Sequence, residues 1–421
     1  MHCSTVRFGK GVSREVGLDL KNLSASNTLV LTDRAVKNSP AYRAVSDSLT
    51  VNSQPFQVFC SVGVEPTESS LREAIEFARK GSFDSFVAVG GGSTMDTAKA
   101  ASLLAANNSN DLLDFATAPA GKDLKPANPM YPLIAVPTTS GTGSEMTCAA
   151  VFDVKGLVIK SGIRLRAIKP TLALLDPLNT LSMPRHVAIY SGFDVLCHAL
   201  ESYTLAPFTE MPAVSDPALR PFYQGSNPIS DVWSARALEI IGKYFRRSVE
   251  NANDLEARAN MMLAASYAGV GFGNAGCHLC HGLAYPISGL GKNFSSPDYP
   301  EKAKFIPHGL TVVLTAPAVF RFTGQVLKER HLTGAKLLAP HLANRNIKLE
   351  NAGEVLADQI RSFMSDFGIP NGLREVGFGQ DDVEPLATTA WNFMGIAVRL
   401  CPREVTNEDL CKICEDSLTV F

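Results

Sequence analysis

The stretch Phe86-Val-Ala-Val-Gly-Gly-Gly-Ser-Thr-Met-Asp-Thr-Ala-Lys-Ala100 is an apolar run that passes through three glycines into a helical pattern. It predicts a buried strand, a tight turn and a helix capped by Ser93. Glycines let the backbone approach phosphate oxygens, and the free N–H groups of a helix start favour an anion. We therefore predict a phosphate-binding turn at Gly91, Gly92 and Ser93. The turn matches neither the G-x-G-x-x-G fingerprint nor a Walker loop.

Strand-like and helix-like runs alternate on both sides of this turn. The strand-like runs cover 28–32, 56–62, 84–90, 132–137 and 172–175, and the clearest helical run covers 69–80. Such alternation predicts a parallel sheet with helices on both faces. A hairpin-like pair covers 148–153 and 157–163. We therefore expect residues 1–184 to form an α/β dinucleotide-binding domain with a Rossmann-like parallel sheet.

Polar residues gather where the predicted strands end. Asp33 follows the first strand, where it would either bind an adenosine ribose or close a turn. Asp96 either complements the helix dipole or orients the nicotinamide end of a nucleotide. The run Thr138-Thr-Ser-Gly-Thr-Gly-Ser-Glu145 offers small donors for a diphosphate and an amide, a composition that a solvated loop also shows. Doubly wound sheets bind ligands at the carboxyl ends of their strands, so we expect a nucleotide site here.

From Pro184 onward the pattern is helical. Helix-like runs cover 186–203, 230–251, 254–272, 275–290, 308–322 and 351–367, with shorter ones near 382–395 and 406–418. No strand-like alternation intervenes, so we expect residues 185–421 to form an all-α metal-binding domain. The Pro-rich segment 206–228 is long enough to indicate a functional loop or lid.

The metal prediction comes from four residues of this helical half. Asp194 and His198 stand four apart in an apolar helical run, so both side chains leave the same face. They would either hydrogen-bond to each other or share a divalent metal. His281 and His308 each stand beside small residues at a predicted helix start. One carboxylate and three imidazoles would make a four-ligand site.

Composition narrows the class of protein. The 421 residues carry a formal net charge of −2 without a basic cluster, so we expect neither a nucleic-acid nor a membrane partner. Nine cysteines, an odd number, indicate reduced thiols in an intracellular compartment. The pairs Cys277–Cys280 and Cys411–Cys414 have the C-x-x-C spacing of haem or zinc sites, but core or surface thiols account for them better. The start Met-His-Cys-Ser-Thr shows no targeting pattern, so we expect a cytosolic protein or a removed segment.

Five motifs together resemble the iron-containing (group III) alcohol dehydrogenases: Gly90-Gly-Gly-Ser-x-x-Asp96, the Thr138–Glu145 loop, Asp194-x-x-x-His198, His281-Gly-x-x-x-Pro286 and Pro307-His308-Gly309. The resemblance covers essentially the whole chain. It implies that Asp194, His198, His281 and His308 hold the metal, with Fe(II) as the usual ion, although the donors suit zinc equally. It also implies NAD contacts at Asp33, Gly91, Gly92, Ser93, Asp96, Thr138, Thr139, Thr142 and Lys160.

Three longer strings, at 192–203, 220–231 and 271–276, resemble a mitochondrial branch of that family. The branch implies that a hydroxy acid such as 4-hydroxybutyrate or 3-hydroxybutyrate is oxidised while 2-oxoglutarate is reduced to 2-hydroxyglutarate. NAD would carry the hydride without leaving, and the metal would act as a Lewis acid. Small hydroxy acids and oxo acids are then the expected partners, the expected location is mitochondrial with a cytosolic alternative, and a homo-oligomer stays open.

Two further residues and two rival functions complete the expectations. Many family members have a second histidine where this chain has Tyr285, so Tyr285 either relays protons through its phenol or packs. Arg220 is our candidate partner for a dicarboxylate, against a simple surface arginine. The first rival is a metal-dependent NAD dehydrogenase that releases NADH, or a lyase-like relative. The second is a non-catalytic protein that binds a nucleotide.

Overall fold

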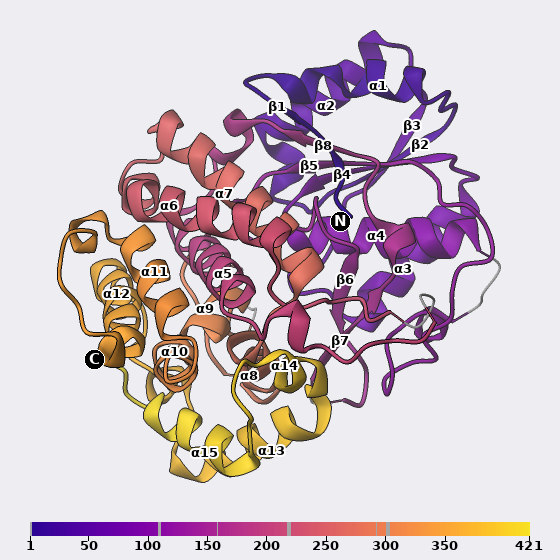
Figure 1. The fold of residues 1–421 in the computed structure, drawn as a ribbon. Helices are drawn as coiled ribbons and strands as arrows, with labels where there is room; N and C mark the ends of the chain where they lie inside the picture. The colour runs from indigo at the N-terminus through magenta and orange to yellow at the C-terminus, as the bar shows by residue number, and fades with distance from the viewer. Residues whose placement is uncertain (1, 108–110, 158, 217–219, 292, 300–303) are drawn as a thin grey trace. The chain divides into compact units, whose positions relative to one another are not determined.

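A computed structural model describes residues 2–107, 111–157, 159–216, 220–291, 293–299 and 304–421. The chain forms two compact units (Figure 1). One contains His2–Met183 and Ala252–Gly269, and the other contains Pro184–Asn251 and Val270–Phe421. Helix α7 (Leu255–Ala275) contributes to both units, because its first part groups with the α/β unit and its last turn with the helical unit.

The first unit is built on a six-stranded sheet with the order β1-β8-β5-β4-β2-β3. Its strands are β1 (Thr5–Phe8), β2 (Thr28–Leu31), β3 (Phe56–Phe59), β4 (Ser85–Gly90), β5 (Leu133–Pro137) and β8 (Leu172–Leu175). All neighbouring strands run parallel. Every residue of β4 and β5 is buried, as expected for strands covered on both faces. The Rossmann-like parallel sheet predicted from the sequence is confirmed.

Alternating side chains of β4 serve the two faces of this sheet. Phe86 and Ala88 belong to the core under α3 (Glu68–Lys80) and α4 (Gly92–Ala106). Val87 and Val89 belong to a second core with residues of α1 (Val16–Asn22) and α2 (Pro40–Val51). The period of two therefore divides one apolar strand between two helical layers.

The hairpin and the edge strand of this unit differ in how clearly the sequence predicts them. The predicted hairpin is present as the antiparallel pair β6 (Ala149–Asp153) and β7 (Lys160–Arg164). The edge strand β1 was not predicted, because it is short and its residues are half-buried or exposed. It is recognised only through its pairing with β8.

The second unit is helical over its described residues, which confirms the all-α expectation. Its helices are α5 (Arg185–Tyr203), α6 (Pro228–Glu250), α8 (Leu279–Leu290), α9 (His308–Val313), α10 (Ala316–Thr323), α11 (Lys328–Leu338), α12 (Ala352–Phe367), α13 (Val383–Phe393), α14 (Gly395–Leu400) and α15 (Asn407–Asp416). Among the described residues, no helix combines the length and apolarity needed to cross a membrane.

Two predicted helices of this unit are wrong in their boundaries. The helix predicted over 275–290 begins only at Leu279, because Gly276 has φ +108°, a left-handed conformation that ends α7. The helix predicted over 308–322 is divided into α9 and α10. The division lies just before Pro317, which lacks the N–H that a continuous helix would need.

The buried helix α5 makes tight contact with α6 at Gly192. A Cβ atom built on Gly192 would lie 2.0 Å from the Phe245 ring. That ring is itself fixed, since it packs against Phe193, Phe363 and Phe367 with centroid separations of 5.4, 5.5 and 4.7 Å. The contact between the two helices therefore requires a glycine at this position.

We expect Gly192→Ala to lower the free energy of unfolding by about 1–3 kcal/mol, the usual range for overpacking a rigid core. Urea denaturation followed by circular dichroism measures the change. Gly395→Ala is the matched control, because nothing lies within 4 Å of a Cβ at that position. Equal midpoints for the two variants would contradict the proposed close contact.

Candidate functional site

Helix α5 presents three buried ionisable side chains on one face. Asp194, His198 and Glu201 are only 2%, 5% and 0% exposed. They follow one another at i, i+4 and i+7, the spacing that aligns side chains on one helix face. An ionised carboxylate in such a place is costly unless it is paired or coordinates a metal.

Two other helices bring imidazoles to Asp194. Its Oδ1 lies 3.5 Å from His198 Nδ1, 3.4 Å from His281 Nε2 and 3.7 Å from His308 Nε2. His281 comes from the first turn of α8, and His308 is the first residue of α9. The four metal ligands expected from the sequence are thus brought together in the helical unit.

The chemistry of these donors fits a divalent metal. Metal–ligand distances of about 2.1 Å in a tetrahedral site place ligand atoms about 3.4 Å apart, close to the separations around Asp194. Over the described part of the chain, Asp194 Oδ1, His198 Nδ1 and His281 Nε2 are buried without a hydrogen-bond partner. Buried polar atoms are nearly always satisfied, so three unsatisfied atoms facing one point indicate a missing ligand.

The electrostatics of the cluster keep two of its donors, Asp194 and His198, in the forms that bind metals, whereas the pKa of His281, which burial would lower, is raised by the Glu201 carboxylate. Burial lowers the pKa of His198 to about 3 against the opposing charge of Asp194, so the ring is neutral at physiological pH. Burial alone would raise the pKa of Asp194. The neighbouring His198 and His308 outweigh it and hold that pKa well below its usual range. A carboxylate and a neutral imidazole are therefore both ready to donate lone pairs.

Glu201 is a functional residue that the sequence analysis missed. Its Oε1 accepts the backbone N–H groups of His278, Cys280 and His281 at 3.0, 2.9 and 3.3 Å. Its Oε2 is paired with His281 Nδ1. Burial would raise the pKa of Glu201, but His281 lowers it to about 2. The carboxylate thus orients His281 and leaves Nε2 for the metal, as in carboxylate–histidine–metal triads.

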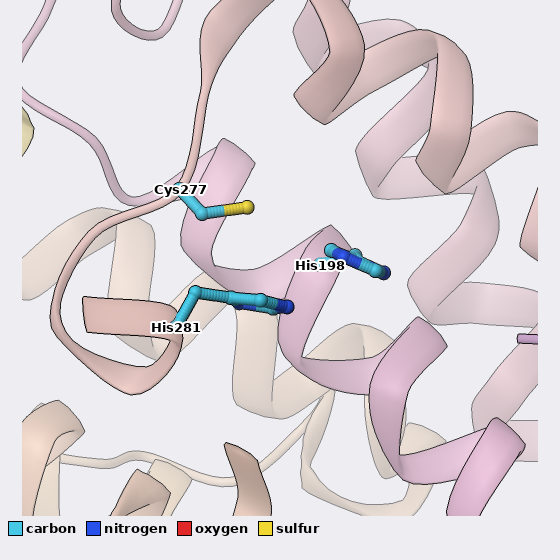
Figure 2. A group of neighbouring side chains, drawn as sticks. All are labelled: His198, Cys277 and His281. Atoms are coloured by element: carbon cyan, nitrogen blue, oxygen red, sulfur yellow. The ribbon is translucent and has the colours of Figure 1, made fainter. Parts of the chain in front are cut away.

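Three neighbouring side chains surround the cluster in different ways. His278 is structural, since Leu279 N–H donates to its Nδ1 at 2.8 Å and Thr204 Oγ1 lies 3.1 Å from its Nε2. Tyr285 is half-buried, with its ring centroid 6.3 Å from that of His308. Cys277 lies beside His198 and His281 (Figure 2), and burial raises the pKa of its thiol to about 12.

Arg220 is exposed, and the segment that follows it is hydrogen-bonded to the last residues of α7. The backbone N–H groups of Gln224 and Gly225 donate to the carbonyls of Asn274 and Ala275 at 3.1 and 3.0 Å. Residues 217–219 lie outside the described residues, so only part of the predicted loop over 206–228 is characterised. The proposed role of Arg220 stays a prediction.

In the α/β unit, the expected nucleotide contacts other than Lys160 lie at or just after the carboxyl ends of β2, β4 and β5, and Lys160 begins β7. Gly90 and Pro137 are partners in the register of β4 and β5, and Thr138 N–H donates to the Gly90 carbonyl at 3.0 Å. The two turns that follow therefore lie side by side. A Cβ on Gly92 would come within 2.5 Å of the Thr142 side chain, so small residues are needed there. This is the strand edge where doubly wound sheets bind ligands.

The expected cap of α4 is wrong in one detail. The helix begins at Gly92 with Gly91 as its N-cap, and no side chain caps it. Ser93 already lies inside the first turn, where its Oγ accepts the Glu65 N–H at 3.2 Å. Because Gly91 has no side chain to occupy the first N–H groups, they stay available for an anion.

A second residue missed from the sequence, Lys99, connects this helix to the threonine-rich loop. Its Nζ is fully buried and donates to Ser144 Oγ at 2.6 Å and to the Ala149 carbonyl at 2.7 Å. Asp96 accepts from Ser144 Oγ at 2.6 Å and from Val151 N–H at 2.9 Å. Asp96 thus positions the loop. The three-residue spacing of Asp96 and Lys99 could have indicated from the sequence that the two side chains lie on one helix face and interact.

Two other predicted nucleotide contacts, Asp33 and Lys160, already form hydrogen bonds or ion pairs within the protein. Asp33 Oδ1 accepts the N–H groups of Ala35 and Val36, both at 2.8 Å, which is the turn that the sequence left open for it. Lys160 is buried, and its Nζ lies 2.7 Å from Glu65 Oε2 and 3.2 Å from Asp153 Oδ1. Burial opposes the charge of Lys160, yet the Glu65 and Asp153 carboxylates raise its pKa. Thr139 flanks Gly91 across the two turns.

Comparisons with known families match both halves of the chain. A model described as "Iron-containing alcohol dehydrogenase" matches residues 3–177. A second, "Fe-containing alcohol dehydrogenase family, C-terminal", matches residues 222–418. Together they span most of the described structure, including the strand edge of the α/β unit and the α8–α9 region of the helical unit.

Known relatives and solved structures agree with these matches. The chain is 52% identical to "Hydroxyacid-oxoacid transhydrogenase, mitochondrial" of Caenorhabditis briggsae and 51% identical to the Homo sapiens protein of that name, covering 100% of this chain and 90% of each relative. A solved "Alcohol dehydrogenase from Oenococcus oeni" is 27% identical, with a TM-score of 0.84 and 99% coverage of both chains. A 1,3-propanediol oxidoreductase structure is 25% identical, with a TM-score of 0.84 and coverage of 99% and 98%.

We expect Glu201→Gln to weaken metal binding by about 10- to 100-fold, the usual effect of losing a carboxylate behind a metal-binding histidine. The amide cannot accept from His281 and from the backbone as the carboxylate does. Competition with a chromophoric chelator measures the affinity.

The matched control is Glu239→Gln, an exposed glutamate in the same helical unit whose partner is Arg236. It should bind metal as the unaltered protein does. If Glu201→Gln binds metal with the same affinity as this control, Glu201 does not position His281.

Proposed function

Because this chain belongs to the iron-containing alcohol dehydrogenase family, an oxidoreductase family, we propose that it transfers hydride from a hydroxy acid to an oxo acid. The donor would be 4-hydroxybutyrate or 3-hydroxybutyrate, and 2-oxoglutarate would be reduced to 2-hydroxyglutarate. The observation that carries the proposal is the convergence of Asp194, His198, His281 and His308. It occurs in a chain about half identical to full-length transhydrogenases.

The metal ligands would be Asp194, His198, His281 and His308, and we propose Fe(II) as the ion, with zinc as the alternative. When bound, a divalent ion supplies Lewis-acid chemistry: it polarises a carbonyl and lowers the pKa of an alcohol. The chain's own contribution is the charge balance. Asp194 supplies the single carboxylate among the four ligands, and the Glu201 carboxylate behind His281 supplies a second negative charge, so together they would balance a divalent ion.

Family membership implies a nicotinamide cofactor, and the strand edge of the α/β unit is the proposed place for it. The free N–H groups at the start of α4 would hold the diphosphate, and Thr138, Thr139 and Thr142 would donate further hydrogen bonds. NAD supplies the hydride acceptor and donor when bound. Lys99 and Asp96 keep the threonine-rich loop in place through Ser144.

Tyr285 is the proposed protein group for proton movement at the metal centre. It occupies the position where many family members have a histidine, and it is half-buried beside His308. The phenol O–H of Tyr285 would donate a hydrogen bond to a developing alkoxide. The acid substrates would be oriented by Arg220.

A second candidate keeps the site and changes the cofactor cycle. The family descriptions and the solved structures are those of alcohol dehydrogenases, so an enzyme that releases NADH to solution is the alternative. The relatives that are named transhydrogenases are also named mitochondrial, and we propose the same location for this protein.

The deciding assay uses purified protein loaded with Fe(II), 4-hydroxybutyrate and 2-oxoglutarate, with no NAD added. We expect 2-hydroxyglutarate, because a retained cofactor would be oxidised and reduced within each cycle. Mass spectrometry of the product measures it. If product forms only when NAD is supplied, and NADH accumulates once 2-oxoglutarate is omitted, the protein is instead a dehydrogenase of the same family.

We expect Arg220→Ala to raise the KM for 2-oxoglutarate by about tenfold or more, since a charge-assisted hydrogen bond would be lost. The KM for an uncharged aldehyde should stay nearly unchanged. Arg345→Ala, at another exposed position of the helical unit, is the control. Equal increases for the acid and the aldehyde would remove Arg220 from substrate recognition.

A further inference from the structure

Cys277 gives the metal centre a sulfur atom that its proposed ligand set does not use. The residue lies between α7 and α8, directly after Gly276, whose φ of +108° turns the chain toward α5. The Sγ of Cys277 and the ring nitrogens of His198 and His281 all lie within 4.8 Å of one another. Figure 2 shows the three side chains beside one another. The ring centroids of His198 and His281 are 4.3 Å apart, and the rings are stacked.

The two imidazoles have the properties of ligands toward this sulfur. Their side chains are 6% and 10% exposed, and each places one ring nitrogen in the group that contains the Cys277 Sγ. Zinc–sulfur and zinc–nitrogen bonds of about 2.3 and 2.0–2.1 Å place ligand atoms about 3.3–3.6 Å apart. Ligand atoms that all lie within 4.8 Å of one another reach that geometry through side-chain movements of about 1 Å.

The other thiols of the helical unit do not offer this arrangement. Cys280 is completely buried, and its thiol interacts with Cys197 rather than with the imidazoles. Cys401 and Cys414 are buried, and neither belongs to a group of metal-ligating side chains among the described residues. Cys277, in contrast, belongs to such a group together with His198 and His281.

We propose that the metal centre contains a second, softer ligand set, His198–Cys277–His281, which shares two imidazoles with the Asp194 set. A borderline or soft divalent cation such as zinc or cobalt(II) would be bound with the Cys277 thiolate as an additional ligand, whereas Fe(II) would use Asp194 and His308. On binding, the S–H bond breaks, a metal–sulfur bond forms and the proton passes to water. Thiolate ligands favour zinc over harder ions, so Cys277 would shift metal preference.

The inference rests on the proposed metal centre, but its test is independent of turnover. The protein is stripped of metal, loaded with one equivalent of cobalt(II) and examined by absorption spectroscopy. We expect a thiolate-to-cobalt charge-transfer band in the near ultraviolet. The band should persist in Cys411→Ser, which removes another half-buried thiol, and vanish in both Cys277→Ser and Cys277→Ala.

A competition measurement gives the second readout. With a chromophoric chelator, Cys277→Ser should lose about tenfold or more in zinc affinity, while its Fe(II) affinity stays within about twofold. Equal losses for both ions would mean that the substitution merely disturbs the site and would overturn the inference. Urea midpoints for both Cys277 variants establish that they are folded.

The outcomes separate this inference from the proposed function. Stoichiometric cobalt binding without a thiolate band, or a band that survives in Cys277→Ser, overturns the second ligand set and leaves the transhydrogenase proposal intact. A thiolate band in a protein that turns over no hydroxy acid supports the second set while the proposed function fails. If no cobalt binds at all, the metal centre and the second set both fall.

Discussion

The helical unit depends on one buried charge, the carboxylate of Asp194. Removing a carboxylate from water costs several kcal/mol unless a counter-charge is supplied, and three imidazoles lie 3.4–3.7 Å from this one. A divalent cation held by these four residues would supply that counter-charge, which accounts for the convergence of residues from α5, α8 and α9 on one oxygen. The surrounding helices are then constrained to deliver these side chains, and the Gly192 contact with Phe245 is one example of that constraint.

Much of this arrangement could be read from the sequence, because the deciding signals are local. The strand, glycines and helix of 86–100 predict the phosphate-binding turn, and the spacing of Asp194 and His198 predicts a shared helix face. Boundaries were less certain. The start of α8 depends on the positive φ of Gly276, and α9 ends before Pro317 within an unbroken apolar pattern. The edge strand β1 has no hydrophobic alternation and is defined by its partner β8.

The residues missed from the sequence share a different physical cause. Glu201, Lys99 and Cys277 act through contacts with other segments, so their own neighbours in the chain do not reveal them. A glutamate or lysine within an apolar helix can face solvent or be buried, and only the tertiary partner decides which. The C-x-x-C spacing indicates that Cys277 is a core or surface thiol, and it carries no signal that the Sγ lies within 4.8 Å of ring nitrogens of His198 and His281.

Glu201 also ties one proposed metal ligand to the packing of two helices. Its carboxylate satisfies three N–H groups at the start of α8 and holds the His281 ring, so these bonds join α5 to α8 through protein atoms alone. The orientation of His281 is therefore coupled to the stability of the helical unit. A distant substitution that loosens α5 against α8 would also loosen the imidazole, and it would weaken metal affinity without touching a ligand.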